Sequence, residues 1–151
     1  MLRVNAGTKL NDEKIECITI YADSLPLRRM VSDARKNNKC RNLNGNRKIK
    51  TMIIYNDGSI FLCSLNPDTY LARLDAADYY LVDPIRTMIR KNEIREIVSK
   101  TNASHRRDIA KAKADGMYVN LTCNRKTRDY IFTESGRIYG LAYIRSAADA
   151  N

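Results

Sequence analysis

Apolar and polar residues alternate in several short stretches of the first half of the chain, and turn residues separate these stretches. Leu2–Asn5 and Ile15–Tyr21 follow the two-residue period of a strand. Lys50–Tyr55 and Ser59–Leu65 flank Asn56-Asp57-Gly58, a sequence typical of a hairpin turn. The pattern therefore predicts a small, mostly antiparallel sheet.

Two helices are predicted in the same half. The first begins at Asp23-Ser24-Leu25-Pro26, where cap candidates precede a proline. Its apolar residues recur at helical spacing and predict one buried face: Leu27, Met30, Val31 and Ala34. Arg28 and Arg29 lie off that face. Asn66-Pro67-Asp68 begins the second helix, with the proline in the first turn, where its missing N–H costs nothing.

The second half repeats this order with a weaker opening. The predicted elements are a strand at Ile94–Ser99, a helix at His105–Ala114 followed by Gly116, a hairpin formed by Tyr130–Thr133 and Arg137–Ile144, and a closing helix at Ser146–Asn151. Gly116 stands where a glycine commonly ends a helix.

The two halves also match residue by residue at an offset of 78. Without a gap, 12 of the 46 pairs between residues 28–73 and 106–151 are identical. The identical pairs include basic residues, such as Arg47 with Arg125 and Lys48 with Lys126, and not only apolar ones. We interpret the chain as a tandem duplication with an α+β fold. Each module would have a short, mostly antiparallel sheet and one or two helices, with residues 1–75 as module one, 76–91 as a structured joint and 92–151 as module two.

The charge is shared evenly between the halves. The net charge is +10, and residues 1–75 carry 13 Lys and Arg against 8 Asp and Glu, while residues 76–151 carry 14 against 9. An excess of this size favours a polyanionic partner, most often nucleic acid. The alternative is that the charge only keeps the protein in solution.

Two basic clusters are the leading candidates for binding: Arg47, Lys48 and Lys50 in the first half, and Arg125, Lys126 and Arg128 in the second. At the mouth of a strand, such side chains can reach the phosphates of a nucleic acid. They could instead protect a strand edge against aggregation, but their presence in both copies favours binding. Arg28 with Arg29 and Arg106 with Arg107 begin the predicted helices, where the helix dipole disfavours cations, and we add them to the candidates.

Other chemistry is sparse. Cys17 and Cys63 lie in apolar alternation and are expected in the core, and no cysteine spacing suggests zinc. His105 is the only histidine, no glycine-rich phosphate loop occurs, and most tyrosines are expected to pack in cores. The sequence predicts no catalysis, no metal and no cofactor. The first residues lack an apolar signal segment and no stretch could span a membrane, so we expect a cytoplasmic protein.

Short motifs in both halves resemble the RemA family of small bacterial DNA-binding regulators of extracellular-matrix genes. In module one these are Val4-Asn5-Ala6-Gly7, Ser24–Met30, Asp33-Ala34-Arg35, Arg47–Lys50, Pro67-Asp68-Thr69 and Arg73-Leu74. In module two they are Ile97-Val98-Ser99, Gly116-Met117, Thr122 and Arg125–Arg128. The opening and closing motifs are absent from the second copy.

The resemblance implies small α+β subunits that assemble into rings and bind DNA through arginines on the outer surface. It places both basic clusters on the DNA-contacting surface. It also implies a basic residue on the second strand, where this sequence has the acids Glu16 and Glu93. Because each chain would supply two subunits, we expect a homo-oligomeric ring of about four chains.

We therefore predict a double-stranded DNA-binding regulator or architectural protein, associated with the nucleoid, that contacts phosphates with little sequence readout. Two alternatives remain open. One is an oligomer that sequesters an anionic nucleotide. The other is an adaptor for a protein partner, in which Glu16 and Glu93 redirect the surface.

Overall fold

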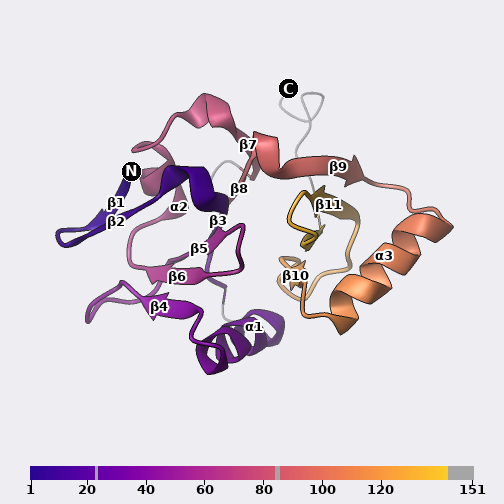
Figure 1. Ribbon diagram of the computed structural model, residues 1–151, viewed down its shortest axis with the longest axis horizontal. Coiled ribbons are helices and arrows are strands. Elements are labelled where there is room, and N and C mark those ends of the chain that lie inside the picture. Colours follow the sequence, from indigo (N-terminus) through magenta and orange to yellow (C-terminus); the bar gives the residue numbers. More distant parts are fainter. Residues whose placement is uncertain (23, 84–85, 143–151) are drawn as a thin grey trace.

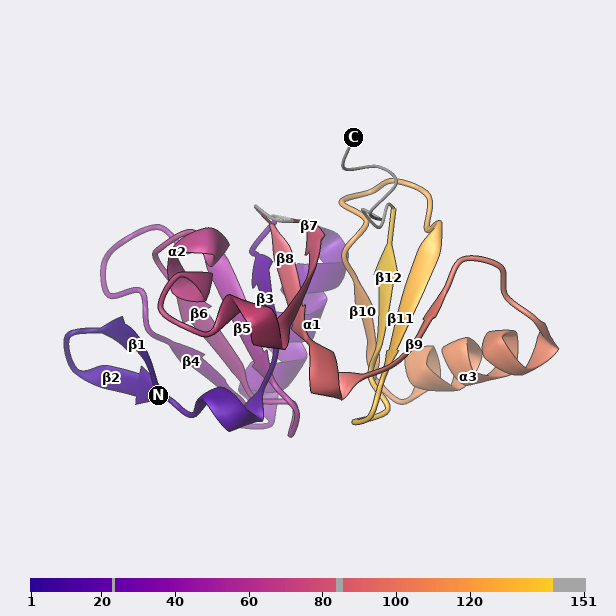
Figure 2. The ribbon, with the colours of Figure 1, turned by 90° about the horizontal axis from the view of Figure 1, so that it is seen from above.

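The computed structural model describes residues 1–22, 24–83 and 86–142, and it contains two sheets that face each other (Figures 1 and 2). The first half of the chain forms β1 (Leu2–Asn5), β2 (Thr8–Leu10), the 3-10 turn η1 (Asp12–Lys14), β3 (Ile15–Ile20), α1 (Leu25–Lys36), β4 (Cys40–Asn42), β5 (Thr51–Tyr55), β6 (Ile60–Cys63) and α2 (Pro67–Leu71). The second half forms η2 (Ala76–Asp78), β7 (Tyr79–Asp83), β8 (Thr87–Arg90), η3 (Lys91–Glu93), β9 (Ile94–Val98), α3 (Ala103–Ala114), β10 (Tyr118–Asn120), β11 (Asp129–Thr133) and β12 (Ile138–Leu141). The predicted α+β class is confirmed.

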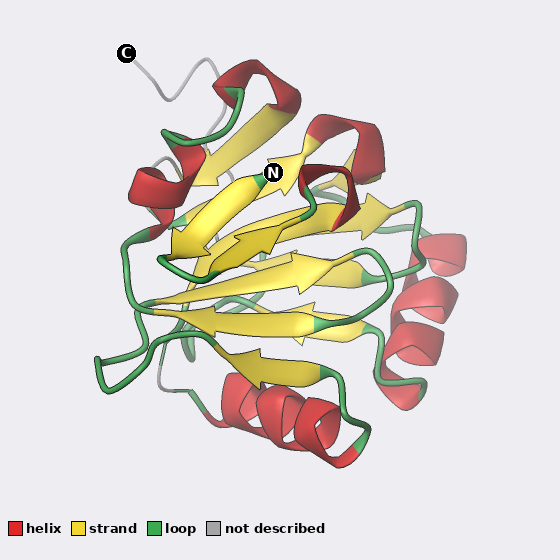
Figure 3. Ribbon diagram, turned by 60° about the vertical axis from the view of Figure 1, so that its left-hand side comes forward, coloured by secondary structure: helices red, strands yellow, loops and turns green. Residues whose placement is uncertain are grey.

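The strands are mainly antiparallel and their order links the two halves. One sheet has the order β4-β6-β5-β3-β8-β7, a second has the order β10-β12-β11-β9, and β1 and β2 form a separate pair. Only the β4–β6 and β10–β12 pairs are parallel among the described strands. β8 and β7 come from the second half of the sequence but extend the sheet of the first half, because β8 pairs with β3. Figure 3 shows the strands at the centre and the helices at the periphery.

The tandem duplication is visible in the elements themselves. Adding 78 to the bounds of α1, β4, β5 and β6 gives the bounds of α3, β10, β11 and β12. The residue that follows each hairpin's two central turn residues is a glycine, Gly58 (φ +92°) or Gly136 (φ +91°), in a conformation that other residues rarely adopt. The same backbone is therefore built twice from sequences that share only part of their residues.

The two long helices begin in different ways. In α1, Ser24 stands at the N-cap and Pro26 in the first turn, and Leu27 and Val31 bury the predicted apolar face. In α3, Asn102 and His105 form a capping box, in which the Asn102 side chain accepts from the His105 amide at 2.8 Å. His105 therefore has a structural role at the start of this helix.

The apolar residues form three clusters. The β1–β2 pair and α2 cover one face of the larger sheet, a second cluster lies between the two sheets, and a third lies beneath α3. Cys17 and Cys63 are fully buried in the first two of these regions, as the sequence predicts. The predicted closing helix Ser146–Asn151 and the end of the predicted strand Arg137–Ile144 lie outside the described residues.

Candidate nucleic-acid interface

The two basic clusters lie in equivalent loops, residues 43–50 and 121–128, each of which connects a short parallel strand to the next strand of the hairpin. In the larger sheet, Thr51 pairs with both Ile20 and Cys63, so the loop lies at the end of the sheet where β3 and β6 finish. In Figure 2 both loops lie along the upper side of the molecule. We call them together the basic edge.

All six predicted cluster residues are exposed, but they precede the strands. β5 begins at Thr51 and β11 at Asp129, so Lys50 and Arg128 are the last residues of their loops. The predicted strand Lys50–Tyr55 therefore begins one residue later than expected, and the basic side chains do not alternate along it. An asparagine- and glycine-rich turn delays the strand, and the side chains leave a loop in several directions.

Backbone hydrogen bonds hold both loops in the same way. In the first, the amides of Leu43 and Lys50 donate to the carbonyls of Leu62 and Cys63 at 2.7 and 2.9 Å. In the second, the amides of Leu121 and Arg128 donate to Gly140 and Leu141 at 2.9 and 2.8 Å.

The turns inside the two loops agree at the first central residue and differ at the second, where Asn124 has φ +67° and its equivalent Asn46 is not left-handed. Gly45 and its equivalent Cys123 share a left-handed conformation, with φ of +60° and +53°. Each loop therefore carries its basic side chains on a backbone that hydrogen bonds hold to the adjacent strand.

The helix arginines are divided by the structure. Arg28 and Arg29 are exposed in the first turn of α1, which follows β3 at the same end of the sheet as the basic edge. The first turn of α3, which carries Arg106 and Arg107, lies at the far right of Figure 2, away from the loop of residues 121–128. The Arg106 guanidinium donates to the Thr101 carbonyl at 3.1 Å. The structure therefore does not bring this second arginine pair to the basic edge.

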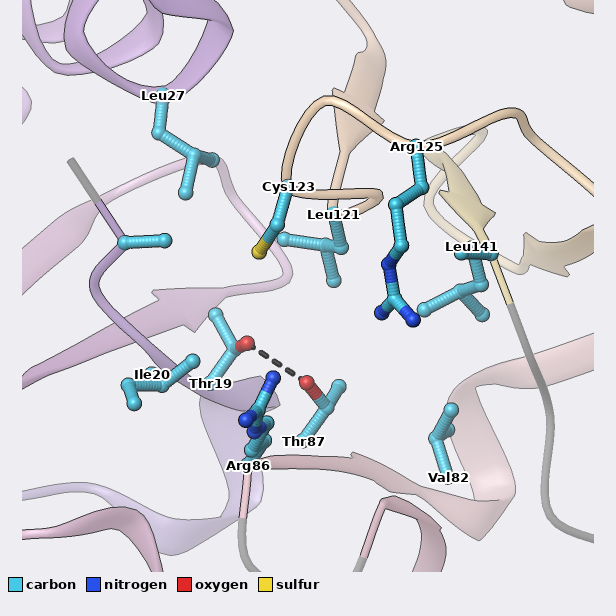
Figure 4. A pocket seen from close by; sticks show the side chains of 12 residues that line it. Thr19, Ile20, Leu27, Val82, Arg86, Thr87, Leu121, Cys123, Arg125 and Leu141 are labelled. Carbon is cyan, nitrogen blue, oxygen red and sulfur yellow. Dashed lines mark hydrogen bonds between the residues drawn. The ribbon is translucent and has the colours of Figure 1, made fainter. Parts of the chain in front are cut away.

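A small cavity opens between the two halves beside the basic edge (Figure 4). Arg125 points into it from the loop of residues 121–128, and Arg86, at the start of β8, lines it from the opposite side. A buried hydrogen bond of 2.8 Å joins the Thr19 and Thr87 hydroxyls at its floor. The sequence comparison did not single out Arg86. Its equivalent in the first half is Gly7, in a loop shorter by one residue, so no basic residue is repeated at this position.

Glu16 does not lie on the basic edge, which corrects the expectation from the family pattern. Its side chain is fully buried, and its carboxylate accepts hydrogen bonds from the Arg137 guanidinium at 3.0 Å and from the Ser135 and Tyr139 hydroxyls. Burial, followed by the nearby Cys17 and Glu16, raises the pKa of Tyr139 well above its usual value, so the phenol stays protonated and donates. Glu16 therefore joins the two halves of the chain and is not presented to a partner.

Glu93, unlike Glu16, does not lie on a strand, because it ends η3 immediately before β9. Its carboxylate accepts from the Asn56 amide group at 3.1 Å, a second polar contact between the halves. Glu16 and Glu93, which the family pattern places at the same position, are therefore not equivalent. Glu16 contacts the second half from the first, and Glu93 contacts the first half from the second.

The predicted cluster residues of this surface are exposed cations, and exposed cations attract anions. Within the described ranges no group of three or more His, Cys, Asp or Glu side chains could hold a metal ion. Burial raises the pKa of the Cys63 thiol to about 12 and that of Cys17 further still, so neither is a ready nucleophile. Tyr70, Tyr79 and Tyr139 are buried and cannot stack on bases. The exposed side chains of the two loops include the lysines and arginines of both clusters.

Comparison with known proteins supports the tandem duplication. A family model described as RemA-like, Extracellular matrix regulatory protein A-like, matches residues 1–74 and 85–146. The chain is also similar to two proteins named "Putative regulatory protein", from Dictyoglomus turgidum and Dictyoglomus thermophilum. Each is 30% identical over 78 residues, which cover 52% of this chain and 91% of the relative. The matched length equals the spacing of the internal repeat. No helix within the described ranges has the length and apolar character needed to span a membrane.

Proposed function

The chain belongs to the RemA-like family, and from this membership and its two basic loops we propose that it is a regulator that binds double-stranded DNA. The observation that carries the proposal is the equivalence of the exposed clusters Arg47–Lys50 and Arg125–Arg128. Basic residues stand at the same three positions in both modules, on loops held by matching hydrogen bonds. The even division of the net charge supports the use of both.

The proposed contacts are to the phosphate backbone. Long, exposed cations on a loop can each meet a phosphate, and such contacts hold a protein on the duplex without reading its sequence. Reading bases in the major groove usually requires a helix or a two-stranded ribbon placed in the groove. The basic edge consists of loops, so we expect weak discrimination between sequences and an architectural or regulatory role on the nucleoid.

The competing proposal is that these arginines enclose a small anionic nucleotide, and the cavity beside Arg86 and Arg125 is the observation that favours it. The two can be separated by titrating the protein with two duplexes of unrelated sequence and with a nucleoside triphosphate. DNA binding predicts a similar affinity for both duplexes, and this affinity should fall steeply with salt concentration. The triphosphate should displace DNA only at concentrations high enough to raise the ionic strength. Saturable binding of one triphosphate per chain, with no retention of either duplex, would overturn the DNA proposal.

We further propose that the protein is a homo-oligomer, most simply a ring of about four chains. Each module of roughly 75 residues is small for a self-sufficient core, and association would cover surface that it leaves exposed. A ring would also align many copies of the basic edge along one duplex. Light scattering at micromolar concentration tests this: a stable particle of 17.3 kDa, the mass of one chain, would contradict the proposed assembly.

A further inference from the structure

The contact between the two halves of the chain is made of two unlike surfaces. The first half contributes the outer edge of β3, together with Glu16 and the hairpin residue Asn56. The second half contributes the β7–β8 hairpin, with Glu93, Ser135 and Arg137 beside it. β8 adds to β3 as an antiparallel neighbour and continues the sheet. The contact is therefore head-to-tail, and a repeat of it needs only another β3-like edge and another hairpin.

Residue equivalence in this region can be read from the pairing. Ile15 pairs with Tyr55 and Ile94 pairs with Thr133, and the residues that follow Ile15 and Ile94 are the irregular ones, Glu16 and Arg95. The Asn56 and Glu134 amides donate at 2.8 Å to the carbonyls of Lys14 and Glu93. Equivalent residues of the two halves are therefore 79 positions apart from β2 to β3, because the loop between β7 and β8 has one extra residue. From α1 onward they are 78 positions apart. By this equivalence Glu16 corresponds to Arg95, and Glu93 corresponds to Lys14.

The chain carries one unused copy of each surface. β9, the equivalent of β3, is at the end of the order β10-β12-β11-β9 and pairs only with β11 among the described strands. β2, the equivalent of β8, pairs in the described part of the chain with β1 alone. Ile97 is 41% exposed, whereas its equivalent Ile18, which lies between β5 and β8, is fully buried. The β1–β2 hairpin and β9 face opposite sides of the molecule (Figure 2).

We propose that chains of this protein join head-to-tail, with β2 of a second copy adding antiparallel to the free edge of β9. The internal contact sets the register, in which Thr87, Met88 and Ile89 stand opposite Thr19, Ile18 and Cys17. Transferred to the equivalent positions, Thr8, Lys9 and Leu10 of the second copy stand opposite Val98, Ile97 and Glu96. This inference rests on the proposed homo-oligomer and identifies the surfaces that meet in it, and it is independent of DNA binding.

The charges at the junction favour this assembly. Inside the chain, Glu16 meets Ser135 and Arg137. At the junction, Arg95 on β9 takes the position of Glu16, and Asp57 of the second copy takes the position of Ser135. The basic residue is therefore on the chain that supplies the strand edge, and the acidic residue is on the chain that supplies the hairpin. The second internal contact, Asn56 with Glu93, becomes Glu134 with Lys14 of the second copy. Both transferred contacts pair opposite charges, and all four side chains are exposed in the single chain.

The same charges oppose incorrect pairings. If the β3 edge of one chain met the β1–β2 hairpin of another, Glu16 would face Asp57. If β9 met the β7–β8 hairpin of another chain, Arg95 would face Arg137, and Glu134 would face Glu93. Like charges placed together in an interface favour the alternative in which they are separated. The tandem chain therefore encodes a strict alternation of internal and intermolecular contacts.

Charge reversal tests the junction directly. At a micromolar concentration where the wild type is assembled, Arg95→Glu or Asp57→Arg alone should weaken association by about tenfold or more, and the double variant should regain much of it. Arg41→Glu, the same reversal on the exposed edge strand β4, is the control and should leave the mass unchanged. Sedimentation velocity without DNA gives the result independently of the DNA proposal. A wild type that remains a single chain, or single variants that assemble like the wild type, would overturn the junction.

A disulfide provides a second test that does not depend on charge. In a background with the exposed Cys123 replaced by serine, Ile97→Cys with Lys9→Cys places two thiols at partner positions of the proposed β9–β2 pair. Oxidation should produce covalent multimers of whole chains. Ile97→Cys with Arg3→Cys is the matched control, because Arg3 lies on β1, one strand further away. Equal cross-linking in both variants, or none in the first, would contradict the proposed register.

Discussion

The Arg137 guanidinium donates a 3.0 Å hydrogen bond to the Glu16 carboxylate, although both side chains are almost completely buried and 121 residues separate them. The Ser135 and Tyr139 hydroxyls donate to the same carboxylate. A buried charge is tolerated only when it is paired and its remaining atoms are hydrogen-bonded, and here both conditions are met. This pair fixes the two modules, and with them the two basic loops, in one arrangement.

Removal of one partner of that pair should be strongly destabilising. Arg137→Ala leaves the Glu16 carboxylate buried without its counter-ion, and we expect a loss of about 3–5 kcal/mol in the free energy of unfolding. The double variant Glu16→Leu with Arg137→Met, which removes both charges, should lose less. Urea unfolding measures both, and Arg41→Ala on the exposed β4 is the control. A loss below about 1 kcal/mol for Arg137→Ala would mean that the pair does not hold the modules together.

Neutralising either basic cluster should weaken DNA binding to a similar extent. Arg47→Ala with Lys48→Ala, or Arg125→Ala with Lys126→Ala, removes two phosphate contacts and should make the slope of log K against log salt shallower by roughly one to two units. Fluorescence anisotropy with two unrelated duplexes measures this. An effect confined to one module, or to one duplex, would disagree with two equivalent phosphate-binding loops.

The cysteines should differ sharply in reactivity. Cys123 is exposed and should react first with a thiol reagent in the native protein, whereas Cys17 and Cys63 are fully buried and burial raises the pKa of both thiols. Cys40 is half-buried, with its pKa also raised by burial, and should be slower than Cys123. Timed labelling followed by mass spectrometry provides the order. Cys123→Ser should abolish the fast phase, and early modification of Cys63 would contradict the described core.

Stability should fall at alkaline pH. Burial raises the pKa of Tyr70 from 10.0 to about 12, and it also raises that of Tyr139. The folded chain therefore keeps these protons at a pH where the unfolded chain releases them. The contribution of Tyr70 is complete below pH 10 and is lost as the pH rises from about 10 through 12. Urea midpoints measured from pH 8 to 11 should decline above pH 10, and Tyr70→Phe should reduce the decline. A flat profile would contradict the burial of these phenols.

The duplication and most of the longer elements could be predicted from the sequence, because their signals are local. Alternation and a turn with glycine predicted the β5–β6 hairpin, and helical spacing with Pro26 predicted α1. The three-residue strands β2, β4 and β10 are too short for a clear period and form only because a neighbouring strand is present.

The arrangement of the modules could not be predicted in the same way. A match at a fixed offset of 78 fails before α3, where the loop between β7 and β8 adds a residue, and it places Ile94 opposite Glu16. The family pattern paired Glu16 with Glu93, whereas strand pairing shows that the equivalent residue is Arg95. The position of Glu16 shows the second limit. A carboxylate on a short strand resembles a surface residue until the residues that surround it, Ser135, Arg137 and Tyr139, are brought from the other half of the chain.

The most direct test of the central claim, that both modules bind one DNA through the same repeated surface, is the salt dependence of a variant that lacks both clusters. Arg47, Lys48, Arg125 and Lys126 are replaced together by alanine, and the variant is compared with the wild type on one duplex. Lys36→Ala, Arg41→Ala, Lys91→Ala and Lys111→Ala together form a control with the same loss of charge. We predict that the slope of log K against log salt falls by roughly the sum of the two double variants, and that the control changes it much less. A slope equal to that of the wild type would contradict the claim and place the DNA surface elsewhere.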